Sequence, residues 1–254
     1  MSTNLNTEVL IIGGGPTGMV AAIYLDLLGI SSIVIERRAK ISTHPKAHEL
    51  SARSIEILMQ LGISMEDLLA EAAPYEEASR IAFCHEINSV IGDIDLRADE
   101  HDQKYKKHLA ASHPYLNISQ TALEIILRKR LLDCNHSKFF GAHQWESMNE
   151  DEISIHSNVI NLENDTSLKI KSQYLICADG AGSRSRKSLG IEMIGADKIN
   201  DFLSVYFEND LSGYVNHHAK LYWIFHPDCP GTMIAHHISR RWVCLLYTSD
   251  AADD

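Results

Sequence analysis

The first segment with a composition typical of a functional site is rich in glycine: Gly13-Gly14-Gly15-Pro16-Thr17-Gly18. It follows the apolar run 9–12 and precedes a helical stretch, 19–28, which stops at Gly29. Residues 32–35, Ser-Ile-Val-Ile, read as a second strand, with Glu36 at its end. This order of strand, glycine turn, helix, strand and acid is typical of a segment that binds a dinucleotide.

Each part of the segment has its own physical role in that interpretation. Gly13 permits a tight turn after the strand, Gly15 lets the backbone approach a pyrophosphate, and Gly18 lets the helix pack close to the sheet. The helix N-terminus offers N–H groups to phosphates, and Glu36 can accept hydrogen bonds from ribose hydroxyls. A purely structural glycine turn is the alternative, and the motif does not say which dinucleotide binds.

A second group of polar residues, Asp179-Gly180-Ala181-Gly182-Ser183-Arg184-Ser185-Arg186, follows the apolar run 174–178, which we expect to be a buried strand. An acid at a strand end can orient N–H groups or accept from a hydroxyl, and the glycines permit close backbone approach. Arg184 and Arg186 can donate hydrogen bonds to anionic oxygens. Taken alone, the segment fits a tight turn with a basic helix start equally well.

Joined together, these segments resemble the flavin-dependent aromatic hydroxylases, the class A FAD monooxygenases that include phenol and dichlorophenol hydroxylases. The resemblance covers residues 5–243, with weaker matches at 222–224 and 226–227. The matching pieces are Gly13-x-Gly15-x-x-Gly18, Glu36-Arg37, Pro45-Lys46-Ala47-His48, Arg53-Ser54-x-Glu56, Gln120 with Leu123-Glu124, and Cys177-Ala178-Asp179-Gly180.

The resemblance implies FAD as the cofactor, with NADPH or NADH as co-substrate. It implies that the cofactor-binding residues are Gly13, Gly14, Gly15, Pro16, Thr17, Gly18, Glu36, Arg37, Arg53, Gln120, Asp179 and Gly180. Of these, Gln120 would approach the flavin, and Arg53 is a pyrophosphate contact or, equally, a helix-surface arginine. Lys46 stands where relatives commonly carry arginine. Because lysine lacks the bidentate fork of arginine, Lys46 is not among the predicted cofactor-binding residues.

His48 is the one candidate catalytic residue. In phenol-hydroxylating relatives this loop position lies near the flavin and the substrate, and a histidine there could take or relay the phenol proton near neutral pH. A surface loop histidine is the alternative, in a chain with 14 histidines. The pairs His217-His218 and His236-His237 read as strand residues, and we expect no metal site because no carboxylate or cysteine accompanies them at useful spacing.

The implied reaction is the hydroxylation of a phenolic small molecule by O₂ through a flavin hydroperoxide, after NAD(P)H reduces FAD. An NAD-dependent dehydrogenase and a flavin halogenase are the other oxidoreductases considered. The 179–180 turn and Gln120 argue against the first, and the isolated Trp145, Trp223 and Trp242 lack the halogenases' paired tryptophans. A third alternative is that this chain is an inactive, truncated FAD-binding fragment.

The helices and strands expected around these residues indicate an α/β fold. The resemblance implies a Rossmann-like, GR2-type FAD-binding domain with an inserted, mainly antiparallel β-sheet substrate domain. We place the FAD-binding parts at 1–80 and 118–192, and the substrate-domain strands at 81–117 and 193–243. Helices are expected at 50–61, 65–73 and 118–132, from apolar spacing. Strands are expected at 81–96, 152–156, 167–170, 202–207, 220–225 and 232–238, and a polar loop at 93–108.

Bulk properties exclude several classes of function. The formal charge of −11 argues against nucleic acid and anionic membrane surfaces as partners. Five scattered cysteines suggest neither a zinc site nor a disulfide framework, which fits a cytoplasmic protein. No signal peptide or membrane-spanning segment is recognised, and a homo-oligomer is compatible with the sequence.

The last eleven residues, 244–254, resemble the conceptual translation of a sequencing adapter. A native strand over 243–247 with an acidic tail is the alternative. A third family motif, a glycine-aspartate pair that holds the ribityl chain, is not found after Asp201. We therefore expect the natural chain to continue beyond Val243.

Overall fold

The computed structural model describes residues 3–44, 46–96, 115–196 and 201–247. The chain divides into two compact units, each built from separated segments. Unit 1 comprises residues 1–43, 60–63 and 123–194, and unit 2 comprises 44–59, 64–122 and 195–254. Residues 44–59 and 64–80, which the sequence analysis assigned to the FAD-binding part, therefore cluster with unit 2.

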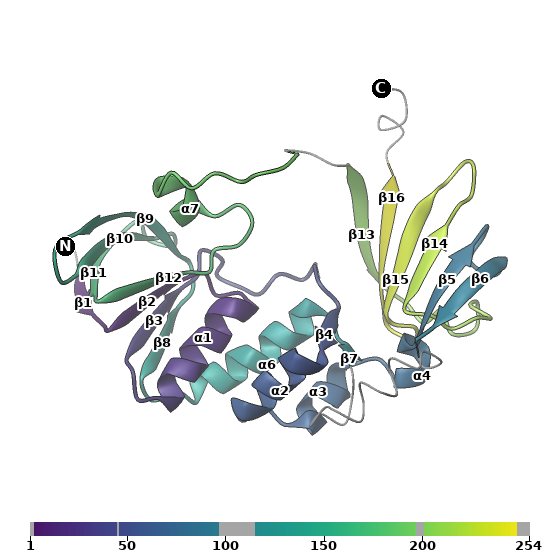
Figure 1. Ribbon diagram of the computed structural model, residues 1–254, viewed down its shortest axis with the longest axis horizontal. Helices are drawn as coiled ribbons and strands as arrows, with labels where there is room; N and C mark the ends of the chain where they lie inside the picture. Colours follow the sequence, from purple (N-terminus) through teal and green to yellow (C-terminus); the bar gives the residue numbers. More distant parts are fainter. Residues whose placement is uncertain (1–2, 45, 97–114, 197–200, 248–254) are drawn as a thin grey trace. The chain divides into compact units, whose positions relative to one another are not determined.

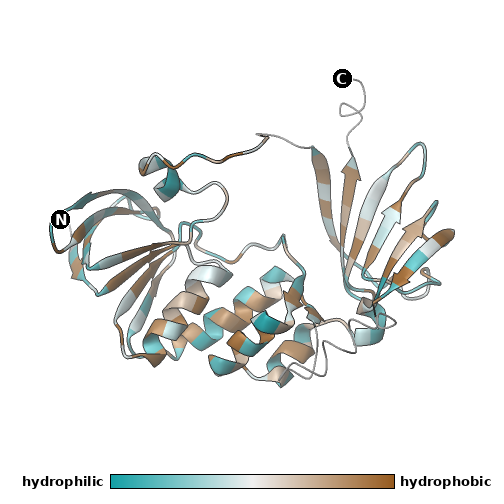
Figure 2. Ribbon diagram, in the orientation of Figure 1, coloured by the Kyte–Doolittle hydropathy of each residue, from teal (hydrophilic) through white to brown (hydrophobic). Residues whose placement is uncertain are grey.

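Unit 1 is built on a four-stranded parallel sheet in the order β12-β2-β3-β8 (Figure 1). Its strands are β2 (Val9–Ile12), β3 (Ser32–Ile35), β8 (Ser137–Phe140) and β12 (Tyr174–Cys177). All four residues of β2 and of β3 are buried, and Figure 2 shows hydrophobic colour along these strands. Apart from Ser32 their residues are apolar, which suits central parallel strands because these are covered on both faces.

A second sheet covers one face of the parallel sheet, in the order β1-β11-β10-β9. Its strands are β1 (Thr3–Asn6), β9 (His143–Glu150), β10 (Ile155–Asn161) and β11 (Ser167–Ser172). Its inward residues Trp145, Val159 and Ile170 pack with Leu10 and Ile33 of the parallel strands. Helix α1 (Pro16–Leu27) packs against β2, β3 and β8, and α7 (Arg184–Ser188) follows β12.

Unit 2 contains a six-stranded sheet in the order β13-β16-β15-β14-β5-β6. Neighbours are antiparallel except β14 and β5, which are parallel. The strands are β5 (Arg80–Cys84), β6 (Val90–Asp95), β13 (Phe202–Glu208), β14 (Leu221–Ile224), β15 (Gly231–His237) and β16 (Arg241–Tyr247). Fully buried Tyr222 and Trp242 lie in the core of this sheet.

The remaining elements of unit 2 are short. Strands β4 (Glu49–Ser51) and β7 (Tyr115–Asn117) form an antiparallel pair. Helices α2 (Ala52–Gln60), α3 (Met65–Glu71) and α4 (Tyr75–Ala78) follow β4. Helix α6 (Gln120–Leu132) begins in unit 2 and ends in unit 1. The α/β fold class expected from the sequence is confirmed: one unit has a parallel sheet with helices, and the other has a mainly antiparallel sheet.

Several sequence expectations about individual elements are wrong in detail. Helix α1 begins at Pro16 rather than residue 19, because proline suits the first helical position and Gly15 serves as the N-cap. The helix expected from residue 50 begins at Ala52, because the preceding three residues pair with β7. Of the strand expected at 152–156, only residues 155–156 are in a strand, where they begin β10, and the polar strand β9 was not expected at all.

Two further corrections concern exposure and position. The run 174–178 was expected to be buried, but β12 is an edge strand and the Tyr174 side chain is 67% exposed. His217 and His218 lie in the loop before β14 rather than in a strand.

Strand β16 is paired with β13 as far as Tyr247, so the paired strand includes the first residues of the suspected adapter tail. Residues 248–254 and most of the expected polar loop lie outside the described residues.

Candidate functional site

The glycine turn in unit 1 joins the carboxyl end of β2 to α1, and a Cβ at Gly13, Gly14 or Gly18 would collide with neighbouring atoms. Gly13 has a φ of +104°, and a Cβ there would collide with the Ala178 carbonyl oxygen. A Cβ on Gly18 would collide with the Gly13 carbonyl oxygen. The structural roles predicted for these two residues, a tight turn and close helix packing, are therefore observed directly.

Gly15 differs from its neighbours because the space beside it is open. A Cβ at this position would meet no atom within 4 Å, and φ is −74°, which any residue can adopt. Gly15 caps α1 without a side-chain hydrogen bond, and the first turn of α1 carries no acidic residue. The turn thus presents the helix N-terminus to a space that an anionic ligand can approach.

Glu36, at the end of β3, lies beside this turn. Its Oε2 accepts the Gly14 backbone N–H at 2.8 Å, and its Oε1 accepts the Arg38 N–H at 2.9 Å. Each carboxylate oxygen has a second lone pair, so both can still accept a hydroxyl proton. The sequence predicted a ribose-binding acid here, and the structure adds that the same carboxylate holds the glycine turn in place.

A cleft opens on this turn, and it includes residues that the sequence analysis missed. Gly14, Gly15 and Glu36 line it, as do three cations: Arg38, Lys40 and Arg128. Arg37, the predicted residue, is exposed and is not among the lining residues.

Arg128 comes from α6, far away in the sequence. Its guanidinium carbon lies 3.1 Å from the centre of the Phe139 ring. Burial lowers the pKa of Arg128, and the nearby Glu36 charge opposes that shift. An arginine remains cationic despite such a shift, so it supplies a partly desolvated positive charge to the cleft. Only the spatial packing of α6 against this sheet could reveal it.

The second polar segment forms a tightly bonded turn after β12. The Asp179 carboxylate accepts the Ser183 and Ser185 hydroxyls at 2.6 and 2.7 Å and the Arg184 and Ser185 N–H groups at 2.8 and 3.0 Å. Burial alone would raise the pKa of Asp179, but these hydrogen bonds outweigh it and leave the pKa below its usual value. Gly180 adopts a φ of +81°, which the turn requires.

In unit 2, His48 is held by a defined chain of hydrogen bonds. Its Nδ1 lies 3.0 Å from the Asn117 Oδ1, and the Asn117 amide nitrogen donates to the Ala235 carbonyl at 2.7 Å. Because that amide donates to a carbonyl, its oxygen faces His48 and must accept. His48 therefore carries its proton on Nδ1 and leaves the Nε2 lone pair available.

His236 lies beside this pair. Its ring centroid is 5.4 Å from that of His48, at an interplanar angle of 89°. Only 3% of His236 is exposed, and its Nδ1 has no hydrogen-bond partner in the described part of the chain. Burial and the positive charge of neighbouring His48, Arg241 and His44 lower the pKa of His236 to about 3. His236 is consequently neutral at physiological pH.

The other two predicted cofactor residues lie in unit 2. Gln120 opens α6, where its backbone N–H donates to the Ala47 carbonyl and its side-chain oxygen accepts the Ala47 N–H at 3.4 Å. Arg53 is exposed and pairs with Glu56 at 2.9 Å along α2. The glycine turn, Glu36 and the 179–180 turn are thus together in unit 1, whereas His48, Gln120 and Arg53, the last a predicted pyrophosphate contact, belong to unit 2.

A parallel sheet with a glycine turn at the carboxyl end of a central strand, followed by a helix N-terminus and an acid, defines a Rossmann-like dinucleotide-binding protein. The chain belongs to the family described as "FAD binding domain", which it matches over residues 6–254. The open side of Gly15, the cationic cleft and the Glu36 oxygens fit the ADP part of FAD.

Individual relatives are monooxygenases named for phenols. The chain is 29% identical over 236 residues to a 2,4-dichlorophenol 6-monooxygenase of Delftia acidovorans, covering 89% of this chain and 39% of the relative. It is 32% identical over 191 residues to a phenol 2-monooxygenase of Pseudomonas sp. (strain EST1001), covering 74% and 31%. The resemblance inferred from the motifs is therefore confirmed.

A solved structure agrees with these relatives. The crystal structure of the flavin-dependent monooxygenase PieE in complex with FAD and substrate aligns with a TM-score of 0.91 at 27% identity. The alignment covers 100% of this chain and 45% of that one. The chain thus spans less than half the length of the relatives and of this structural neighbour.

Among the described residues, no helix is long and apolar enough to cross a membrane.

Proposed function

We propose that the protein is an FAD-dependent monooxygenase that hydroxylates a phenolic small molecule with NAD(P)H and O₂. The observation that carries this proposal is the hydrogen-bonded chain from His48 through Asn117 to the Ala235 carbonyl. It fixes a histidine with an available Nε2 at the position where phenol-hydroxylating relatives carry a residue near the substrate.

The ADP part of FAD is held, in this proposal, by the cleft of unit 1. The N-terminus of α1 beside Gly15 meets the pyrophosphate, with Arg38 and Arg128 as further cationic contacts, and Glu36 accepts from the ribose. Asp179 acts as a positioning residue, because its carboxylate is already committed to holding the 179–185 turn. The chemistry that FAD supplies when bound is the uptake of reducing equivalents from NAD(P)H and the activation of O₂.

His48 acts as the general base. Its Nε2 takes the phenol proton, which leaves negative charge on the phenol oxygen and makes the ring more nucleophilic toward electrophilic oxygen. The protonated ring keeps its Nδ1–H bond to Asn117, so the side chain holds one orientation before and after proton transfer. Neutral His236 beside it adds no competing charge.

The first test is the flavin itself. The protein should bind one FAD and show a flavin absorption spectrum. A colourless protein that binds NAD tightly would support the dehydrogenase alternative and refute the proposal. Titration of FAD into the 254-residue chain tests the inactive-fragment alternative, which tight stoichiometric binding with turnover of a phenol would exclude.

The second test addresses His48. In the whole protein, H48Q should lower kcat for phenol hydroxylation by about 10²–10⁴-fold near neutral pH, the usual contribution of a general base. The loss should shrink as the pH approaches about 10, where a phenol ionises without help. N117A should produce a smaller deficit with the same pH dependence, because it frees the His48 ring without removing it. H156Q, which replaces an exposed histidine of unit 1, is the control. A wild-type pH profile in H48Q would exclude His48 as the base.

The setting of this activity is also part of the proposal. The formal charge of −11 and cysteines that are free in the described structure support a cytoplasmic enzyme of small molecules rather than a binder of nucleic acid. A homo-oligomer is compatible with this setting.

A further inference from the structure

A group of three metal-binding side chains lies at one edge of the six-stranded sheet of unit 2. Strands β5 and β14 run parallel, with Cys84 in register with Ile224. The Phe225 N–H continues the pairing by donating to the Cys84 carbonyl at 2.9 Å. Parallel neighbours end at the same sheet edge, so His85 and His226, which follow them, emerge side by side.

The backbone on both sides of this edge is well defined. The turn after β5 is closed by two hydrogen bonds, from the His85 N–H to the Ser89 carbonyl at 2.9 Å and from the Ser89 N–H to the Glu86 carbonyl at 2.8 Å. Phe83 and Phe225 stack beneath the edge with ring centroids 6.4 Å apart and an interplanar angle of 11°. The strands therefore fix where the following side chains start.

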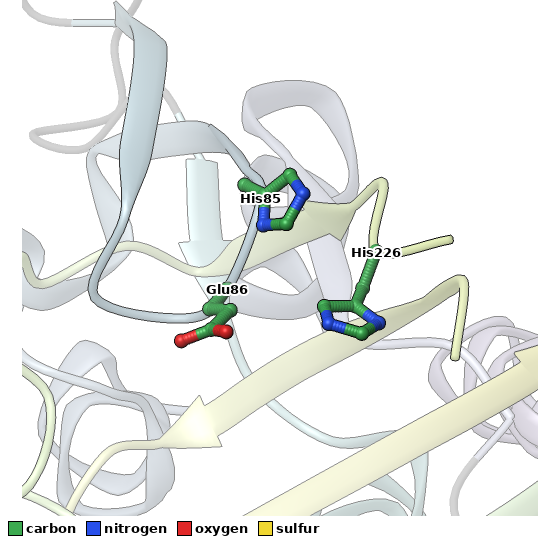
Figure 3. A group of neighbouring side chains, drawn as sticks. All are labelled: His85, Glu86 and His226. Carbon is green, nitrogen blue, oxygen red and sulfur yellow. The ribbon is translucent and has the colours of Figure 1, made fainter. Parts of the chain in front are cut away.

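The three side chains converge. One ligand atom from each of His85, Glu86 and His226 lies within 4.8 Å of the other two. The two imidazole rings meet edge to face with centroids 5.2 Å apart. Figure 3 shows the side chains of His85, Glu86 and His226 grouped together. His85 and Glu86 are exposed, so small side-chain rotations can bring the ligand atoms to the bond lengths of about 2.0–2.2 Å that zinc needs.

The ring nitrogens of His226 have distinct roles. Its Nδ1 accepts the Asp228 N–H at 3.2 Å, which leaves Nε2 as the nitrogen for a metal. In the metal-free neutral ring the proton is on Nε2, so metal binding moves it to Nδ1 and breaks this long hydrogen bond.

We propose that His85, Glu86 and His226 bind one divalent cation of the zinc class, with water in the remaining coordination positions. Two imidazoles and a carboxylate form a donor set that borderline metals such as Zn²⁺ favour, whereas Mg²⁺ prefers oxygen ligands. The bound metal joins the β5–β6 turn to the segment after β14. The inference is independent of the proposed hydroxylase activity.

The test is calorimetric titration of ZnCl₂ into the metal-free 254-residue chain, repeated with Co²⁺ to read the geometry from its visible spectrum. One equivalent of Zn²⁺ should bind and raise the thermal unfolding midpoint, and MgCl₂ should not. H85A and H226A, on separate segments, should each weaken binding by at least about tenfold, since loss of even an outer-shell partner costs roughly 10- to 100-fold. E86Q should also bind more weakly, because it removes the ligand charge.

H156A is the matched control, because His156 is an exposed histidine of unit 1 that faces a carboxylate, Asp151, at 2.8 Å. It should bind zinc as the unaltered chain does. Equal zinc affinity in H226A and the unaltered chain would overturn the proposal, as would an equal loss in H156A or absence of one-to-one binding. Circular dichroism of H85A and H226A, both altered after strand ends, verifies that lost binding does not reflect unfolding.

Discussion

Alanine at Gly15 should separate ligand binding from folding in the glycine turn. A Cβ there meets no protein atom within 4 Å, and the backbone already has an extended conformation that alanine adopts. Alanine is a poorer N-cap than glycine by about 0.5–1 kcal/mol. It also restricts the unfolded chain, which stabilises the fold by about 0.4–1 kcal/mol. The two effects oppose each other, so G15A should change the free energy of unfolding by less than about 0.5 kcal/mol.

FAD binding should respond differently. The new methyl group occupies the space through which the backbone approaches the pyrophosphate, so we expect the FAD dissociation constant to rise at least about tenfold, or 1.4 kcal/mol. G18A is the matched control, because its Cβ would collide with the Gly13 carbonyl oxygen. Backbone atoms cannot rotate away, so G18A should destabilise the fold by about 1–3 kcal/mol.

Urea unfolding followed by circular dichroism gives the stability of each variant, and quenching of flavin fluorescence gives its FAD affinity. The expected pattern is a folded G15A that binds poorly and a destabilised G18A. Wild-type FAD affinity in folded G15A would refute the assignment of Gly15 to the pyrophosphate. An unfolding midpoint of G18A equal to that of the unaltered chain would refute the packing argument.

Three further outcomes are expected. The folded-state pKa of His236, about 3, lies below the usual 6.5; its contribution to stability is therefore complete above pH 6.5 and is lost as the pH falls toward 3. In H236L, the loss of unfolding free energy between pH 6.5 and pH 3 should be smaller by about 3–5 kcal/mol. Urea unfolding measures this loss, and a loss in H236L equal to that of the unaltered chain would contradict the prediction. Asp179 has a lowered pKa, so its contribution is present above its usual value of 3.8 and is lost below it. D179N should cost about 1.5–3 kcal/mol at pH 7 and much less at low pH, and equal losses at both pH values would exclude a stabilising role for the Asp179 charge in the 179–185 turn. Trp242 is fully buried and donates to the Ile238 carbonyl at 2.9 Å, so W242A should cost about 3–5 kcal/mol in thermal or urea unfolding.

The parts of the fold that could be predicted from sequence are those with local causes. The run 9–12 is apolar throughout and leads into Gly13, and 32–35 has three successive apolar residues after Ser32; both form buried parallel strands as expected. Strand β9 was missed because residues 143–150 are mostly polar and alternate weakly; their strand is stabilised by pairing with β10. The run 174–177 was misjudged because apolar composition cannot distinguish a central strand from an edge strand.

The residues of the candidate site also differ in whether the sequence alone could reveal them. Gly13, Gly18 and Glu36 were recognisable because their spacing along one βαβ unit is set by local geometry. Arg128 was not, because it reaches the cleft only when α6 packs beside the glycine turn. The sequence suggested His48 as a base but carried no sign of its tautomer, which depends on Asn117 and Ala235.

The sequence by itself determined the dinucleotide fingerprint, the α/β class and the resemblance to flavin-dependent hydroxylases, because these depend on residue types at short, fixed spacings. Tertiary structure alone decided which nitrogen of His48 is basic, which cations line the cleft, and that His85, Glu86 and His226 converge. Hydrogen bonds and charge interactions act over a few ångströms in space, and only folding brings such distant positions of the chain within that range.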